Sequence, residues 1–410
     1  MEKIYKNLKL KIDALENYIK TNYKNNFREP GEKMKHQFLV PGASYSKQLW
    51  DWDSWLTGLA LLEIDAKGSE NYQKGCVLNF LDAIGEDGRI PILISEQQYK
   101  IFDVTDKITN IHKPCLAQHA LAISKKYKDV RWIEKDFSKL LRFLNWYHTK
   151  QKDEESGLYF WIDDLAIGFD NDPTVFYRPT KSTGAIYLNC LMYKELLATK
   201  DLAQLLGKKK IVKEYEERAR KLKDAINNEC FDNVDGFYYS VDLSLRKVDP
   251  NDWLHRGCPR FWHSLPIKIK TWASMLPLWA GICDEKHAQT IINNFIKNSG
   301  LKSKFGIRSV SNKEKMYKNI PSGNPSCWLG PIWINANYFL YEGLKNYGFK
   351  KLANQIAVET INLLGTDVIK NKEFHEYYDS DTGLGILNKG FQSWNFLVYN
   401  IIKELKGKYK

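Results

Sequence analysis

Residues 180–229 have the sequence TKSTGAIYLNCLMYKELLATKDLAQLLGKKKIVKEYEERARKLKDAINNE, and this stretch sets the pattern for the whole chain. Apolar side chains recur at i, i+3, i+4 and i+7 in two segments, which predicts helices near 180–199 and 208–229. The connection between the two helices has about 8 residues, whereas the connections before and after the pair have about 29 and 37. A short connection therefore joins the pair, and long connections flank it.

The same alternation runs along the chain, which is predicted to hold twelve helices. Connections into the even-numbered helices have about 24, 29, 29, 37, 32 and 24 residues, and the other five have about 4, 4, 8, 4 and 1. We therefore predict an all-α fold, an (α/α)6 toroid of six helical hairpins, with the even-numbered helices inside and long loops and small β-hairpins at one end. An open α-solenoid is the alternative, but no residue-level repeat of 34 to 47 residues is present. The helices are predicted near 4–24, 49–65, 70–84, 114–127, 132–150, 180–199, 208–229, 267–281, 286–297, 330–347, 349–365 and 390–407.

Composition describes an ordinary globular chain. Its 410 residues are 43% hydrophobic and 27% charged, which excludes disordered, collagen-like and disulfide-dense classes. No linker rich in Pro, Gly or Ser divides the chain, so we expect one domain spanning residues 1–410.

The net charge of +12 raises the question of an acidic partner. The lysines are spread along the chain, which favours a solvated lysine-rich surface over a nucleic-acid-binding patch. The first twenty residues, Met1 to Lys20, contain no apolar run typical of a signal peptide, and no 18-residue apolar run follows. We expect a soluble cytoplasmic protein with neither nucleic acid nor membrane as a partner; the sequence leaves the oligomeric state open.

Cysteine and histidine usage predicts neither disulfides nor a metal. The seven cysteines are odd in number, widely separated and never in a C-x-x-C pattern, as expected for reduced thiols. The eight histidines show no H-x-x-x-H spacing. We therefore expect no metal and no cofactor.

The long loops carry an unusual mixture of aromatic and acidic residues. The loop before the second helix ends in QLWDWDSW (residues 48–55), with three tryptophans and two aspartates. An N-terminal helix cap explains one aspartate but not the clustered indoles. Apolar platforms beside carboxylate acceptors suit a pyranose, which has a flat C–H face and hydroxyl donors at its edge. The loop therefore indicates sugar binding.

Two later loops repeat this chemistry. The sequence IGFDNDP (167–173) precedes the sixth helix, and EFHEYYDSDTG (373–383) followed by GFQSWN (390–395) precedes the twelfth. Each is also consistent with a simple Asx turn, and the last lacks the later acidic ligands of a calcium loop. The tenth helix follows NPSCWLGPIWIN (324–335), in which Pro331 suits a first helical turn.

Together these segments resemble the trehalase-like glycoside hydrolases, most closely the short, single-domain forms of glycoside hydrolase family 63. The resemblance covers about residues 41–400 and rests on LWDWDS (49–54), GFDN (168–171), GPIWIN (330–335) with Asn337-Tyr338, and EYYD (376–379) with Gly383, Phe391 and Trp394. The family has an (α/α)6 barrel and contains inverting α-glycosidases that need no cofactor. It includes bacterial mannosylglycerate and glucosylglycerate hydrolases.

The resemblance implies a role for each matched residue. Asp170 is the general acid, Glu376 is the general base, and Asp53 with Trp52 holds the sugar that is cleaved. The remaining residues expected to bind substrate are Trp50, Gln118, Arg178, Arg260, Arg308, Trp328, Trp333, Tyr377 and Trp394. The expected activity is hydrolysis, with inversion, of a small α-glucoside or α-mannoside, such as glucosylglycerate, mannosylglycerate or a disaccharide.

Two positions depart from the family pattern. Tyr187-Leu188-Asn189 replaces Asp-Leu-Asn, which weakens the transfer of sugar contacts from that helix. Residues 391–394 are FQSW where trehalases have Phe-Gly-Trp, so another small α-glycoside is favoured over trehalose.

Other interpretations remain open on sequence alone. Loop arginines suit an anionic leaving group such as glycerate if they face the pocket, but they serve equally well in structural ion pairs. A sugar epimerase shares the toroid and would use histidines at its mouth, for which His255, His263 and His375 are available. A catalytically silent carbohydrate-binding protein is a third reading.

Overall fold

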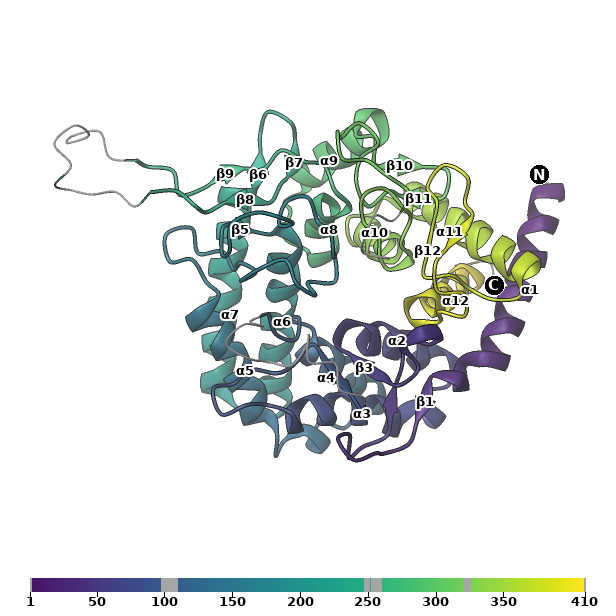
Figure 1. The fold of residues 1–410 in the computed structure, drawn as a ribbon, viewed down its shortest axis with the longest axis horizontal. Helices are drawn as coiled ribbons and strands as arrows, with labels where there is room; N and C mark the ends of the chain where they lie inside the picture. Colours follow the sequence, from purple (N-terminus) through teal and green to yellow (C-terminus); the bar gives the residue numbers. More distant parts are fainter. Residues whose placement is uncertain (1, 97–109, 247–250, 252–259, 321–325, 409–410) are drawn as a thin grey trace.

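The computed structural model describes residues 2–96, 110–246, 251, 260–320 and 326–408. Helices arranged in a closed ring dominate it, and the view in Figure 1 looks down the ring axis. The two ends of the chain lie on the same side of the ring (Figure 1). The structure thereby confirms the predicted (α/α)6 toroid.

Six helical elements form the inner wall. They are α2 (Asp51–Ile64), α4 (Leu116–Tyr127), α6 (Ile186–Leu205), α8 (Leu276–Ala280), α10 (Ile334–Asn346) and the 3-10 segment η7 (Ser393–Leu397) that continues into α12 (Val398–Lys408). Each inner element contacts the next, and η7 packs back onto α2. These contacts close the ring and exclude an open solenoid.

The outer helices are α1 (Glu2–Asn22), α3 (Ala66–Asp82), α5 (Phe137–Lys150), α7 (Lys209–Ala225), α9 (Glu285–Asn298) and α11 (Lys350–Asn371). The inner and outer helices differ in how many of their side chains are buried. The inner helix α6 buries fourteen of its side chains, whereas the outer helix α7 buries only Tyr215, Ala219 and Leu222. These three recur at i, i+4 and i+7, which is the narrow apolar stripe of a surface helix.

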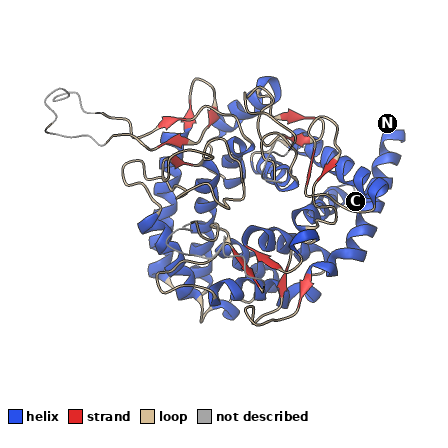
Figure 2. Ribbon diagram, viewed as in Figure 1, coloured by secondary structure: helices blue, strands red, loops and turns tan. Residues whose placement is uncertain are grey.

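Short antiparallel strands occupy the long loops (Figure 2). Two-stranded sheets join β1 (Phe27–Arg28) to β2 (Phe38–Leu39), β3 (Gln48–Trp50) to β4 (Leu93–Ser95), β6 (Phe231–Asp232) to β7 (Phe237–Tyr238), β10 (Lys302–Ser303) to β11 (Gly306–Ile307) and β12 (Tyr377–Tyr378) to β13 (Gly385–Ile386). A three-stranded sheet has the order β5 (Thr183–Gly184), β8 (Val241–Asp242), β9 (Leu265–Pro266). These pairings satisfy backbone groups in loops that the helices leave uncovered.

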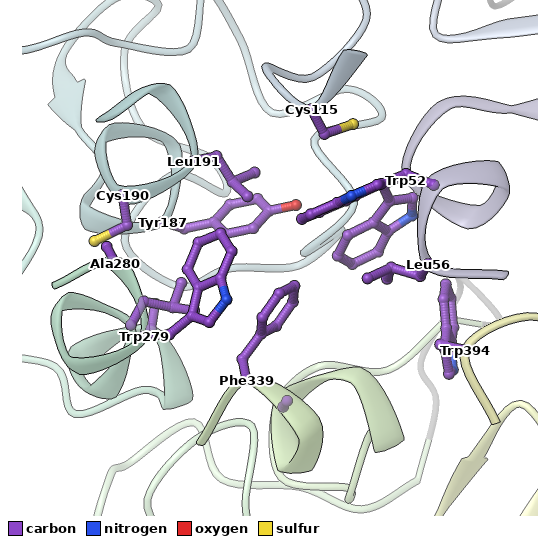
Figure 3. Packing of buried hydrophobic residues seen from close by; sticks show 14 of the residues in the cluster. Trp52, Leu56, Cys115, Tyr187, Cys190, Leu191, Trp279, Ala280, Phe339 and Trp394 are labelled. Carbon is purple, nitrogen blue, oxygen red and sulfur yellow. The ribbon is translucent and has the colours of Figure 1, made fainter. Parts of the chain in front are cut away.

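The centre of the ring is filled by large side chains from several inner elements. Figure 3 shows Trp52 and Leu56 of α2, Tyr187 of α6, Trp279 of α8, Phe339 of α10 and Trp394 of η7 converging on one cluster. Trp279 and Phe339 are in edge contact, with ring centroids 4.7 Å apart. Because this cluster plugs the ring, any ligand must bind at one end and not pass through.

The twelve expected helices are present, but several boundaries differ. For example, α5 begins at Phe137 and not near 132, and α11 ends at Asn371 and not near 365. The helix α6 begins and ends six residues after its predicted limits, and α8 is short because residues 272–275 form a 3-10 turn. The helix α10 begins at Ile334, so Pro331 is not in its first turn, because Ile332 instead forms β-bridges with Arg308 and Tyr378. The predicted twelfth helix corresponds to α12, but its first part, residues 393–397, is likewise a 3-10 segment.

The described cysteines are free thiols. Six of the seven cysteines are buried and unpaired, and Cys258 lies outside the described residues. Among the helices of the described chain, none is both long and apolar enough to cross a lipid bilayer.

A close backbone contact provides a test of the packing. A Cβ atom on Gly75 of α3 would lie 1.8 Å from the carbonyl oxygen of Gln37. We expect Gly75→Ala to lower the free energy of unfolding by about 1–3 kcal/mol, because the backbone before β2 has to move. Gly407→Ala, where a Cβ meets nothing within 4 Å, is the control and should leave the melting temperature unchanged or slightly raised. Equal melting temperatures for the two variants would contradict the packing described.

Candidate active site

A cavity of about 530 Å³ opens among the long loops. Its wall includes eight of the residues expected from the sequence, namely Trp50, Trp52, Asp53, Asp170, Trp328, Trp333, Glu376 and Trp394. The volume is in the range of small-molecule sites. Asp170 and Glu376, 206 positions apart in the sequence (376 − 170), thus share one cavity.

The first turn of α2 separates two aspartates with different surroundings. Asp51 accepts hydrogen bonds from its neighbour Trp52 and from the backbone and ammonium of Lys113, and is fully buried. Asp53 lines the cavity and accepts a hydrogen bond of 2.9 Å from the Ser393 hydroxyl. Burial raises the pKa of Asp53 to about 7, although the Ser393 hydrogen bond opposes this.

The turn that carries Asp170 is held on both sides of that residue. Phe169 is buried against Trp328, and the side-chain oxygen of Asn171 accepts the backbone N–H of Trp328 at 2.7 Å. Gly168 has φ +87°, and a Cβ there would lie 2.6 Å from Cε of Lys113, so this position requires glycine. The flanking residues fix the turn and leave the Asp170 side chain on the cavity wall.

Asp170 is only partly exposed, even to the cavity. Burial raises the pKa of its carboxyl, and a hydrogen bond with the Ser326 hydroxyl and the positive charge of Lys113 act in the opposite direction. A raised pKa keeps a carboxyl protonated and able to donate, as a general acid must.

Glu376 comes directly before β12 and is 5% exposed. Its carboxylate accepts a hydrogen bond from the Asn388 side-chain amide, and the Tyr45 hydroxyl is a second donor. Burial, together with the charges of Asp53 and Asp170, raises the pKa of Glu376 to about 8 despite these hydrogen bonds. The donors to Glu376 are thus a hydroxyl and an amide.

Stacked indoles make the apolar part of the wall. The rings of Trp328 and Trp333 are 3.9 Å apart and nearly parallel, and Trp52 lies against both Trp328 and Trp394. Such an array is rigid because each ring limits the rotation of the next. It presents flat apolar surface beside carboxylate oxygens.

Five residues expected to bind substrate do not line the cavity. Gln118 donates to the carbonyl oxygens of Pro114 and Leu191, and Tyr377 is fully buried and stacks on Trp333 with centroids 4.6 Å apart. The three arginines are held in ion pairs: Arg178 with Asp242, Arg260 with Glu155 and Arg308 with Asp381.

Twelve further residues line the cavity. Four of them belong to motifs recognised in the sequence, namely Gln48, Gly168, Ser326 and Phe391, whereas no motif identified Pro41, Ser44, Tyr45, Lys113, Asp164, Leu165, Ala166 and Phe176. Lys113 is the least expected, since lysine is rarely buried. Its ammonium is 2.9 Å from Asp51 and 5.5 Å from the ring centre of Trp52, and its side chain is 1% exposed. The described residues contain no cluster of three or more His, Cys, Asp or Glu side chains that could hold a metal ion.

The buried ion pair of Lys113 and Asp51 should matter for stability. We expect Lys113→Met to lower the free energy of unfolding by about 3–5 kcal/mol, because it leaves the Asp51 charge buried without a partner. The double variant Lys113→Met/Asp51→Asn removes both charges and should recover most of this loss. Denaturant unfolding of the three proteins checks both statements, and a single variant as stable as the unmodified protein would contradict them.

The raised carboxyl pKa values predict how stability depends on pH. Unfolded Glu376 and Asp53 titrate near 4.5 and 3.8, and the folded groups near 8 and 7. Between these values the folded state holds protons that the unfolded state has released, so stability is highest in acid and falls as pH rises. We expect the melting temperature to fall between about pH 5 and pH 8, and to fall less in Glu376→Gln, whose amide does not titrate.

Glu217→Gln on α7 is a matched control, because Arg220 lowers the pKa of Glu217 to about 2, outside that range. It should leave the pH dependence of the melting temperature unchanged. An identical pH dependence in Glu376→Gln and the unmodified protein would show that Glu376 titrates normally.

Comparison with known proteins adds independent information. Residues 46–395 match the family described as "Mannosylglycerate hydrolase MGH1-like glycoside hydrolase domain". The mannosyl-oligosaccharide glucosidase GCS1 of Arabidopsis thaliana is 25% identical, over 90% of this chain and 48% of its own length. A mannosylglycerate hydrolase of Thermus thermophilus is 30% identical, over 40% of this chain and 32% of its own. The chain thus spans half or less of the length of these relatives.

Solved structures agree on the fold. A glycoside hydrolase family 63 mannosylglycerate hydrolase from Thermus thermophilus, in complex with Tris and D-glycerate, has a TM-score of 0.70 at 20% identity and covers 95% of this chain and 100% of its own. Neutral trehalase Nth1 from Saccharomyces cerevisiae has a TM-score of 0.67 at 16% identity, over 95% of this chain and 79% of its own. Because the family match spans most of the chain and includes all four sequence motifs, the chain belongs to the MGH1-like glycoside hydrolases, which confirms the family 63 resemblance.

Proposed function

We propose that this protein hydrolyses a small α-linked glucoside or mannoside with inversion of the anomeric centre. The observation that carries the proposal is the meeting of Asp53, Asp170 and Glu376 with stacked indoles in one cavity. Membership of a glycoside hydrolase family supports it. Relatives named for mannosylglycerate and for mannosyl-oligosaccharides favour mannose or glucose as the sugar that is cleaved.

In this mechanism, Asp170 protonates the glycosidic oxygen as the leaving group departs. Burial raises the pKa of Asp170 and so favours its protonated form, and the fixed turn around it holds the carboxyl in place. The positive charge of Lys113 lies close enough to favour the carboxylate that forms after proton transfer.

Glu376 removes a proton from the water that attacks the opposite face of the sugar. Inverting enzymes keep their two carboxyls about 6.5–9.5 Å apart so that this water fits between sugar and base. Donors from Asn388 and Tyr45 orient the Glu376 carboxylate and partly offset the burial that raises its pKa to about 8. Glu376 therefore acts as the base after it has lost its proton, and the fraction able to do so grows as pH rises.

Asp53 accepts hydroxyl hydrogens of the sugar that is cleaved, while the indoles contact its C–H face. A hydroxyl donor favours the ionised form of Asp53, so binding of the sugar lowers the raised pKa of this group. Binding of the substrate therefore favours the ionised form of Asp53.

The epimerase reading requires histidines at the cavity. His375 does not line it and is paired with Asp367 at 2.9 Å, and His263 is on the surface near Glu229. His255 lies outside the described residues. No observation therefore favours epimerisation over hydrolysis.

Proton NMR of a reaction with an α-glycoside tests the proposal directly. We expect the β-anomer of the sugar to appear first, and its α-anomer to appear later by mutarotation. Asp170→Asn and Glu376→Gln should each lower kcat by at least about 10²-fold, because each removes one proton transfer, while sugar binding measured by calorimetry persists.

Asp224→Asn on the outer helix α7 makes the same chemical change as Asp170→Asn at an exposed site and should retain full activity. First appearance of the α-anomer would refute inversion. Full activity in Asp170→Asn would remove that residue from the role of acid, and binding without turnover across α-glucosides and α-mannosides would favour a carbohydrate-binding protein.

A further inference from the structure

Acidic side chains outnumber basic ones on the cavity wall. Among the described lining residues, the acidic side chains are Asp53, Asp164, Asp170 and Glu376, and the basic one is Lys113. The Lys113 ammonium is already bound by Asp51, at 2.9 and 3.0 Å to its two carboxylate oxygens. Within this part of the chain, the cavity thus has no cation to spare for an anionic ligand.

The arginines that would suit an anionic leaving group are engaged elsewhere. The nitrogen–oxygen distances are 2.7 Å for Arg178–Asp242 and Arg260–Glu155 and 3.1 Å for Arg308–Asp381. Arg308 also donates to the carbonyl oxygen of Lys302 at 2.6 Å. Turning any of these arginines toward a ligand would break an ion pair and leave its carboxylate behind.

The net charge of the segments outside the described part can be counted from the sequence. The sequence of residues 97–109 contains two lysines and two aspartates, and that of residues 321–325 contains no charged side chain. Residues 247–250 and 252–259 each contain one aspartate and one lysine or arginine. Each of these segments is therefore neutral as a whole.

Depth in the cavity indicates where the leaving group binds. Asp53 and Glu376 are 6% and 5% exposed, whereas Asp164 is half-buried and Phe176 is 37% exposed, which places this second pair nearer the mouth. Asp164 and Phe176 are also on the loop that carries Asp170. A general acid stands beside the bond to the leaving group, so the leaving group lies along this loop.

We propose that the leaving group is electrically neutral, a polyol or a sugar, and that the site discriminates against carboxylates such as glycerate. The inference rests on the proposed hydrolytic activity. The Asp164 carboxylate can accept hydroxyl hydrogens, and Phe176 and Leu165 can contact C–H groups. An anionic leaving group would instead lie beside the Asp164 carboxylate, and none of the described lining residues offers it an unpaired cation.

Matched substrates that differ only in charge test this inference. The pairs are α-glucosylglycerol with α-glucosylglycerate, and α-mannosylglycerol with α-mannosylglycerate, in which CH₂OH replaces the carboxylate. We expect kcat/KM to be roughly tenfold or more higher for the neutral member at low salt, and the ratio to shrink at high salt, which screens charge. A panel of neutral α-disaccharides is assayed beside them.

Variants locate the source of the discrimination. Asp164→Asn should narrow the ratio of neutral to anionic kcat/KM, and Asp164→Lys should narrow it further or reverse it. Asp224→Asn removes one negative charge from the exposed face of α7 and should leave the ratio unchanged. A ratio unaffected by both Asp164 variants would overturn the placement of the leaving group beside Asp164.

The outcomes separate this inference from the function on which it rests. Equal or faster hydrolysis of the glycerate compounds would overturn the neutral leaving group while the hydrolase stands. Failure to hydrolyse any compound, neutral disaccharides included, would refute the proposed function and the inference with it.

Discussion

The contact between α2 and η7 closes the ring, and the geometry of the cavity depends on it. It brings residues near position 53 against residues near position 393, and the Ser393–Asp53 hydrogen bond lies within that seam. Closure also fixes the direction of each inner helix, because every one is wedged between two neighbours. The loops that lead into these helices therefore all lie over the same end of the ring. Residues far apart in sequence become neighbours by this constraint alone.

The cavity concentrates acidic groups at a cost in stability. Asp53, Asp170 and Glu376 all have raised pKa values, with burial as the first cause in each case. Such an arrangement disfavours the folded state at neutral pH, and persists because the surrounding indoles and helices hold it in place. The Lys113–Asp51 pair beneath the cavity is a second expensive feature, since two charges are removed from water. Packing elsewhere in the ring therefore offsets the unfavourable burial of charged groups near the cavity.

Sequence patterns predicted those parts of the structure that local periodicity or a local motif determines. The helix pairs follow from apolar spacing, and the clustered Trp and Asp residues near position 52, which indicate sugar binding, line the cavity. These patterns do not predict the direction in which an individual side chain points. Gln118 is on an inner helix, as expected, but donates to the backbone carbonyls of Pro114, just before its own helix, and of Leu191 in α6. Lys113 is in no recognisable motif, and its burial depends on a carboxylate 62 positions away. The start of α10 was misplaced for a similar reason, because the β-bridges of Ile332 connect it to two distant segments.

The wide separation of Asp53, Asp170 and Glu376 along the chain has a consequence for folding kinetics. No local part of the chain contains both carboxyls of the acid–base pair, so early helical hairpins can form without any part of the cavity being complete. The seam between α2 and η7 joins segments about 340 residues apart, and closing so long a loop is slow because it requires a large loss of chain entropy. Recovery of the assembled cavity during refolding should therefore lag behind recovery of helix, and sugar binding would report the final step of ring closure and not the formation of secondary structure.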